Sequence, residues 1–167
     1  LLAKPDAPEL LEKELAAPGY EPRMIAIGTN TDPYQPIERE YKIMRGILEV
    51  LERAGHPVGI VTKSALVTRD IDILQRMAKR NLVKVALSVT TLDPKLARTM
   101  EPRASAPSKR LQALKQLSEA GIPATVMVAP SRSAPVTFSI ASSMKSACRK
   151  TDALIFTSAG RTGFNSS

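Results

Sequence analysis

Four short apolar runs, separated by segments with helical periodicity, constrain the fold of this chain more than any other feature. Met24–Ile27 and Val58–Val61 show no alternation of apolar and polar residues. We therefore predict strands buried on both faces, the type found in parallel sheets. Strand, helix and strand in succession give a right-handed parallel arrangement. The four predicted strands are Met24–Ile27, Val58–Val61, Val83–Val89 and Ala124–Ala129.

Residues with special backbone preferences mark where the intervening helices begin and end. Short polar side chains favour helix N-caps, and residues that tolerate positive φ favour helix ends. One uninterrupted helix is predicted from Ile37 to a stop at Gly55. Predicted caps are Asp6 (with Glu9 completing a capping box), Thr68 and Asp93, and further predicted stops are Asn81 and Gly121.

The repeat of these units predicts an α/β fold. The segments 54–58 (Ala-Gly-His-Pro-Val) and 120–124 (Ala-Gly-Ile-Pro-Ala) are alike, as expected of repeated βα units. Four strands do not close a barrel of six or eight, so the fold is either an open parallel sheet or part of a barrel. Residues 131–167 differ in character, because nine of them are Ser and only Asp152 is acidic. We expect one domain over 1–130 and a poorly ordered or frame-shifted tail over 131–167.

Composition limits the classes of function that this chain can have. The formal charge of +8 would suit a polyanionic partner, but half of the excess lies in residues 131–167. The single cysteine, Cys148, excludes a disulfide framework or a multi-cysteine metal site within these residues. No run of about 18 apolar residues and no signal-peptide layout is present, so we expect a cytoplasmic protein without membrane contact. His56, the only histidine, precedes its strand and is predicted to be structural.

Polar side chains gather where the predicted strands end. Thr31 and Asp32 follow the first strand, in the loop Gly28–Glu38, and Lys63 follows the second. Ser88 ends the third strand, and Glu101 and Arg103 lie beyond the helical turn after it. Ligands of parallel α/β folds sit at the carboxyl ends of the strands, so these side chains should converge at one mouth. Two simpler interpretations stay open: a turn with an N-cap at Asn-Thr-Asp-Pro, and a solvated charge at Lys63.

Several short motifs in this order resemble the radical S-adenosylmethionine (SAM) superfamily, in the branch related to spore photoproduct lyase, an iron–sulfur DNA-repair enzyme. The resemblance runs from about residue 4 to 130. The motifs are Thr-Asp-Pro-Tyr-Gln-Pro-Ile-Glu (31–38), Val-Thr-Lys-Ser (61–64) with Arg69-Asp70 following, Leu-Ser-Val-Thr-Thr (87–91), Met-Glu-Pro-Arg (100–103), Arg110-Leu111 and Ala-Gly-Ile-Pro (120–123).

This resemblance implies a partial parallel (β/α) barrel, truncated at both ends, and two cofactors, SAM and a 4Fe–4S cluster. It implies cleavage of SAM to a 5′-deoxyadenosyl radical that abstracts hydrogen from a substrate, with a nucleic acid as the substrate by analogy with the branch. Thr31 matches a position at the methionine end of SAM, Lys63 one that pairs with its carboxylate, and Ser88 one near its ribose. Asp32, Glu101 and Arg103 are further expected cofactor-binding residues; SAM offers an amine and hydroxyls to Asp32.

The chain also departs from the family pattern. The family holds its cluster with three cysteines spaced Cys-x3-Cys-x2-Cys, because iron–sulfur clusters need thiolate ligands. That motif is absent, and Cys148 alone cannot replace it. We therefore expect the complete parent to be a radical SAM enzyme and these 167 residues to be an inert fragment of it, from a truncated or shifted reading frame. The alternative is a basic α/β module that binds nucleic acid without catalysis. Three Tyr, three Phe and no Trp offer little for base stacking.

Overall fold

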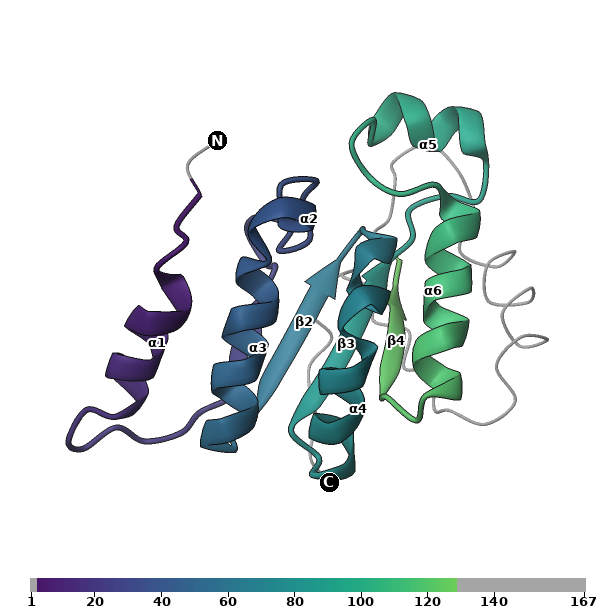
Figure 1. Ribbon diagram of the computed structural model, residues 1–167. Helices are drawn as coiled ribbons and strands as arrows, with labels where there is room; N and C mark the ends of the chain where they lie inside the picture. The colour runs from purple at the N-terminus through teal and green to yellow at the C-terminus, as the bar shows by residue number, and fades with distance from the viewer. Residues whose placement is uncertain (1–2, 129–167) are drawn as a thin grey trace, which may run out of the picture.

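The computed structural model describes residues 3–128, which form a four-stranded parallel sheet, as the sequence predicted (Figure 1). The strand order in the sheet is β1-β2-β3-β4. Each strand follows its predecessor through helical structure, the crossover that parallel neighbours require. The elements are α1 (Ala7–Leu15), β1 (Ile25–Ile27), α2 (Glu38–Tyr41), α3 (Ile43–Ala54), β2 (Val58–Thr62), the 3₁₀ helix η1 (Ala65–Asp70), α4 (Ile71–Lys79), β3 (Val83–Ser88), α5 (Pro94–Met100), α6 (Pro107–Glu119) and β4 (Ala124–Met127).

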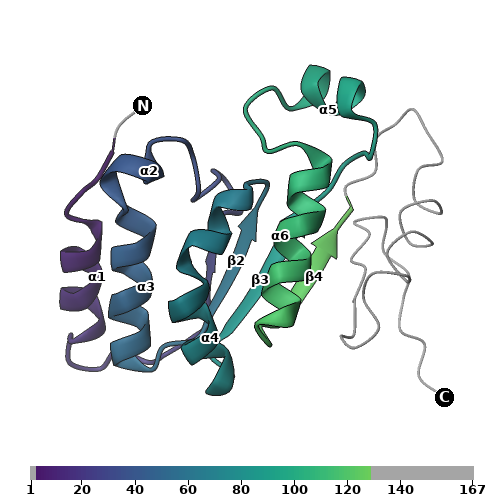
Figure 2. The same cartoon turned by 45° about the vertical axis from the view of Figure 1, so that its right-hand side comes forward.

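The core lies between this sheet and one layer of helices. In the described part of the chain, α3, α4 and α6 cover the same face of the sheet (Figures 1 and 2). Residues in register across the strands, such as Ile60 and Val85, are buried under this layer. The next residues along the strands face the other side, so β2 alternates between buried and half-buried positions. Burial on both faces was therefore a wrong prediction; Met24 is 64% exposed.

The predicted helix stops are confirmed. Gly55, Asn81 and Gly121 have φ angles of 66°, 56° and 74°, the left-handed conformation that ends a helix. Asp93 caps α5 by accepting hydrogen bonds from two backbone N–H groups. Asp6 occupies the N-cap position of α1 as predicted, but the cap predicted at Thr68 is wrong, because α4 begins after Asp70. Thr68 instead donates to the carbonyl of Ala65 within η1, and the side chain of Asp6 makes no capping bond.

The helix predicted from Ile37 onward is interrupted at Lys42. Lys42 has a φ of 50°, which ends α2 and starts α3. The buried Glu38 stabilises the break, because its Oε1 accepts from the backbone N–H of Met44, 3.0 Å away, in the first turn of α3. The Glu38 carboxylate thus satisfies an N–H group that the interruption leaves without a helical partner.

Two further expectations concern residues away from the sheet's carboxyl edge. His56 precedes β2 as predicted, is 2% exposed, and lies with Nε2 2.7 Å from the hydroxyl of Tyr20. The predicted separate tail, residues 131–167, lies outside the described residues. Within residues 3–128 we find no helix of the length and hydropathy that a membrane span needs.

Candidate functional site

Asp32 joins the carboxyl ends of β1 and β2. Its Oδ1 accepts from the hydroxyl of Thr62 at 2.7 Å and from the N–H of Tyr34 at 2.9 Å, and its Oδ2 accepts from the N–H of Lys63 at 2.6 Å. Both oxygens are therefore engaged by the chain itself. Gly28 starts this loop with a φ of 95°, and a Cβ there would collide with the carbonyl oxygen of Val61. Only glycine fits this closely at that position.

Glu101 is the centre of a second set of contacts at the same edge. Its Oε1 lies 2.7 Å from the ammonium of Lys63 and accepts from the hydroxyl of Thr90 at 2.8 Å. Its Oε2 accepts from Arg110 at 2.7 Å. Burial by itself would raise the pKa of Glu101, but the hydrogen bonds from Lys63, Arg110 and Thr90 outweigh it and hold that pKa below its usual range. Glu101 is therefore ionised at neutral pH and fixes the position of Lys63.

Arg110 is the residue of this site to which the sequence reasoning assigned no role. It is 1% exposed and donates to the backbone carbonyls of Ser88 at 2.8 Å and Ser105 at 2.6 Å, besides Glu101. It thus ties the end of β3 to the loop before α6. A signal existed in the sequence, since Arg110 shares the apolar face of its helix with Leu114 and Leu117. A cation on such a face needs a buried partner.

Four of the six predicted site residues line one cavity of about 380 Å³: Asp32, Lys63, Glu101 and Arg103. Lys63 has a side chain 46% exposed, so its ammonium reaches solvent beside the cavity. Thr31 is exposed and Ser88 is buried at the end of β3, and neither lines this cavity. The cofactor-binding roles of the six residues stay predictions.

Tyr34 forms part of the cavity wall. It is 2% exposed, and within the described residues its buried hydroxyl has no hydrogen-bond partner. Burial, and then the nearby carboxylate of Asp70, raises the pKa of Tyr34 well above its ordinary value, so the phenol stays neutral. The guanidinium of Arg69 lies 5.8 Å from the centre of its ring and is itself held by Asp70 and Glu38. These contacts hold the Arg69 guanidinium beside the Tyr34 ring.

The residues on hand fit one of the two implied cofactors. A 4Fe–4S cluster does not fit, because residues 3–128 bring no three His, Cys, Asp or Glu side chains together and the single cysteine lies outside them. The amino-acid end of SAM does fit. An ammonium has three donors, and Lys63 uses one on Glu101, which leaves donors for a carboxylate at the cavity.

Comparison with known proteins decides the family. The model of the radical SAM superfamily matches residues 3–130. The chain belongs to the radical SAM superfamily. It is 37% identical over 130 residues to "Uncharacterized protein Rv2578c" of Mycobacterium tuberculosis, covering 78% of this chain and 38% of that protein. It is 32% identical over 106 residues to "Uncharacterized protein MJ0683" of Methanocaldococcus jannaschii, covering 64% of this chain and 39% of that protein. The chain thus spans about two fifths of the length of these relatives.

Solved structures agree on the fold. Spore photoproduct lyase complexed with dinucleoside spore photoproduct matches with a TM-score of 0.67 at 17% identity, over 88% of this chain and 43% of that one. SuiB of Streptococcus suis bound to S-adenosylmethionine matches with a TM-score of 0.60 at 21% identity, over 85% and 31%. The four-stranded sheet therefore corresponds to part of a radical SAM (β/α) barrel, as predicted. The radical SAM family uses SAM and a 4Fe–4S cluster.

Proposed function

We propose that this chain supplies the SAM-binding edge of a radical SAM enzyme. The observation that carries the proposal is the position of Lys63, held by Glu101 at the carboxyl end of β2 beside the 380 Å³ cavity. In the enzyme, SAM would serve as the precursor of a 5′-deoxyadenosyl radical that abstracts hydrogen from the substrate. The residues of this chain would bind and orient SAM.

Each residue then has a distinct part in the proposed site. Lys63 pairs with the SAM carboxylate through donors that Glu101 leaves free. Glu101 holds Lys63 in place, and Arg110 holds Glu101. Asp32 positions the loop, since both of its oxygens already accept hydrogen bonds from Thr62, Tyr34 and Lys63. Thr31, Ser88 and Arg103 remain proposed cofactor contacts on the resemblance alone.

The substrate, the reaction class and the location are also part of this proposal. A nucleic acid as the substrate and a lyase-type reaction are supported only by likeness of fold to spore photoproduct lyase, which is an analogy and not a property of the site. We propose a cytoplasmic enzyme. We further propose that these 167 residues do not cleave SAM by themselves, because the cluster ligands must come from other sequence.

Titration of SAM into the full-length protein tests the proposed site. Lys63→Ala should weaken SAM binding by about 2 kcal/mol, or roughly 30-fold, because a carboxylate loses its charged partner at a half-exposed position. Lys79→Ala is the matched control, since Lys79 is exposed on α4 and has no ion-pair partner in the described region. Isothermal titration calorimetry measures both affinities. Equal affinities for the two variants would remove Lys63 from the SAM site.

A further inference from the structure

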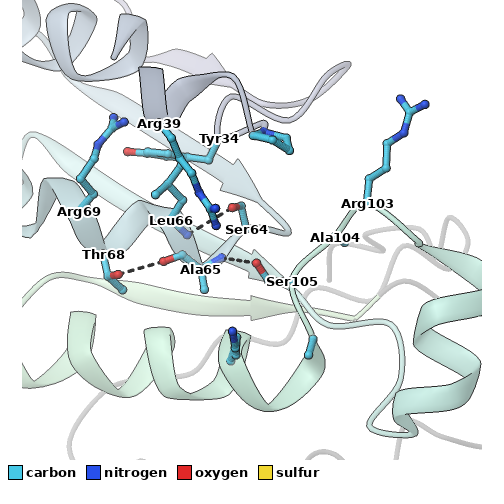
Figure 3. Close-up of a pocket in the computed structure, with 13 residues that line it drawn as sticks. Tyr34, Arg39, Ser64, Ala65, Leu66, Thr68, Arg69, Arg103, Ala104 and Ser105 are labelled. Carbon is cyan, nitrogen blue, oxygen red and sulfur yellow. Dashed lines mark hydrogen bonds between the residues drawn. The ribbon is translucent and has the colours of Figure 1, made fainter. Parts of the chain in front are cut away.

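A second cavity lies beside the proposed SAM site. Its volume is about 610 Å³, and it shares five lining residues with the first cavity: Tyr34, Pro36, Ser64, Arg103 and Ala104. Its walls come from the loop after β1, from α2 and η1, and from the start of α6 with the loop that leads into it (Figure 3). Of the residues proposed to contact SAM, only Arg103 also lines this second cavity.

The side chains around this second cavity carry one sign of charge. Arg39, Arg69, Arg103 and Lys109 line it, and no Asp or Glu does. Arg69 is neutralised by Glu38 and Asp70. The side chains of the other three make no hydrogen bond or ion pair with any residue of the described region.

An unpaired guanidinium, as in Arg39 and Arg103, is the exception among the described arginines. Most arginines within residues 3–128 bond to a carboxylate or a backbone carbonyl, as Arg76 does with Glu52. Of those without such a partner, Arg39 and Arg103 line the second cavity, and Arg98 lies elsewhere on α5. Like charges in one cavity repel each other, so their gathering is unfavourable unless an anion joins them.

Neutral donors complete the walls. Ser105 Oγ accepts from the N–H of Ala65 at 2.9 Å, and Ser64 Oγ accepts from the N–H of Leu66 at 3.2 Å. Each hydroxyl therefore keeps its own hydrogen for another acceptor. Figure 3 shows Ser64 beside Arg39, and Ser105 on the loop that carries Arg103.

We propose that this second cavity binds the phosphate oxyanions of a multiply charged ligand. Guanidinium groups donate two parallel hydrogen bonds to phosphate, and lysine adds a point charge. A single carboxylate would leave most of the positive charge uncompensated, whereas a diphosphate or successive phosphodiesters would not. This inference does not rest on the proposed function, because phosphate binding needs neither SAM nor a cluster.

Titration of inorganic pyrophosphate into the 167-residue chain at low ionic strength tests the proposal. Arg39→Gln and Lys109→Gln should each weaken binding about tenfold, the lower end for a hydrogen bond to a charged group at an exposed position. Matched controls are Lys79→Gln and Arg98→Gln, which remove the same charge from exposed helical positions away from the cavity. They should leave the affinity unchanged. Arg69 is kept, since its contacts with Glu38 and Asp70 are structural.

A second arm identifies the source of the phosphate. An oligothymidylate without terminal phosphates carries only phosphodiesters, and the same variants are titrated with it. Tighter binding of pyrophosphate assigns the cavity to a free oligophosphate, and tighter binding of the oligonucleotide assigns it to a nucleic-acid backbone. Either result supports the proposal if only the cavity variants lose affinity. Equal losses in cavity and control variants, or no binding of either probe, would overturn it.

Discussion

Replacing Arg110 by leucine should destabilise the fold by about 4 kcal/mol. The substitution keeps much of the apolar volume but leaves three acceptors unpaired, namely the carbonyls of Ser88 and Ser105 and one oxygen of Glu101. Hydrogen bonds to charged groups contribute about 1.5–3 kcal/mol each, but contributions within one network do not add. In this variant Glu101, whose side chain is 12% exposed, keeps its contacts with Lys63 and Thr90, so its carboxylate loses only part of its stabilisation. The total falls within the range of about 3–5 kcal/mol for breaking a buried ion pair.

Urea unfolding followed by far-ultraviolet circular dichroism measures this change. Lys115→Leu on the same helix is the control, because its ion pair with Glu119 is exposed, with 3.7 Å between the charged atoms. It should change the stability by no more than about 0.5 kcal/mol.

A double variant makes the test independent of the size of the single effect. Glu101→Leu combined with Arg110→Leu also removes the carboxylate oxygen that loses its partner in the Arg110→Leu variant. The double variant should therefore lose about 2 kcal/mol less than the two single changes together. Additive effects, or an Arg110→Leu variant as stable as the Lys115→Leu control, would refute the network described above.

Three further predictions concern pH, the loop and the cluster. The pKa of Glu101 is lowered on folding, so its contribution to stability is present above its unfolded pKa of about 4.3 and is lost as pH falls through the lower folded value. The difference in unfolding free energy between the protein and its Glu101→Gln variant should therefore shrink below about pH 4. A difference that stays constant with pH in urea titrations would contradict this. Gly28→Ala should lower the free energy of unfolding by about 3 kcal/mol and Gly121→Ala by about 1 kcal/mol, because both residues have positive φ but only Gly28 also faces a backbone oxygen. Equal losses of stability in thermal unfolding would argue against the close approach of Gly28 to the carbonyl of Val61. Anaerobic reconstitution of the 167 residues with iron and sulfide should give no 4Fe–4S cluster, and a stoichiometric cluster that survives Cys148→Ser would disprove this.

The parts of the fold that depend on one residue's own preferences were predictable. Gly55 and Gly121 stop helices because glycine accepts positive φ, and Asp93 caps α5 through its own side chain. The interruption at Lys42 was not predictable in this way. It depends on a contact between Glu38 and Met44 that exists only once the chain has folded, so helical periodicity on both sides concealed it.

The prediction that the strands are buried on both faces failed for a related reason. An apolar run shows that a strand can be covered, but it does not show what covers it. Met24 and Ala26 are apolar yet exposed, since the helices in the described region lie on the opposite face.

In the site, too, the positions of the residues were predictable but their hydrogen-bond partners were not. Positions after strand ends brought Asp32 and Lys63 to one edge, because parallel strands present their carboxyl ends together. Their hydrogen-bond partners could not be deduced from spacing. Asp32 offered a carboxylate in the sequence, but the fold engages both of its oxygens, and the partner of Glu101 was a buried arginine on another element.

The outermost helix, α1, has a consequence for how the molecule opens. None of its residues is fully buried, and it packs on α3 through close contacts such as that of Pro8 with Gly46. Proteins open in cooperative units, and those with the least buried apolar surface open at the lowest free energy. Backbone amides of α1 should therefore exchange with deuterium well before those of β2 and β3. A protease that cuts after α1 detaches would leave the strands, and the polar edge that they carry, in place.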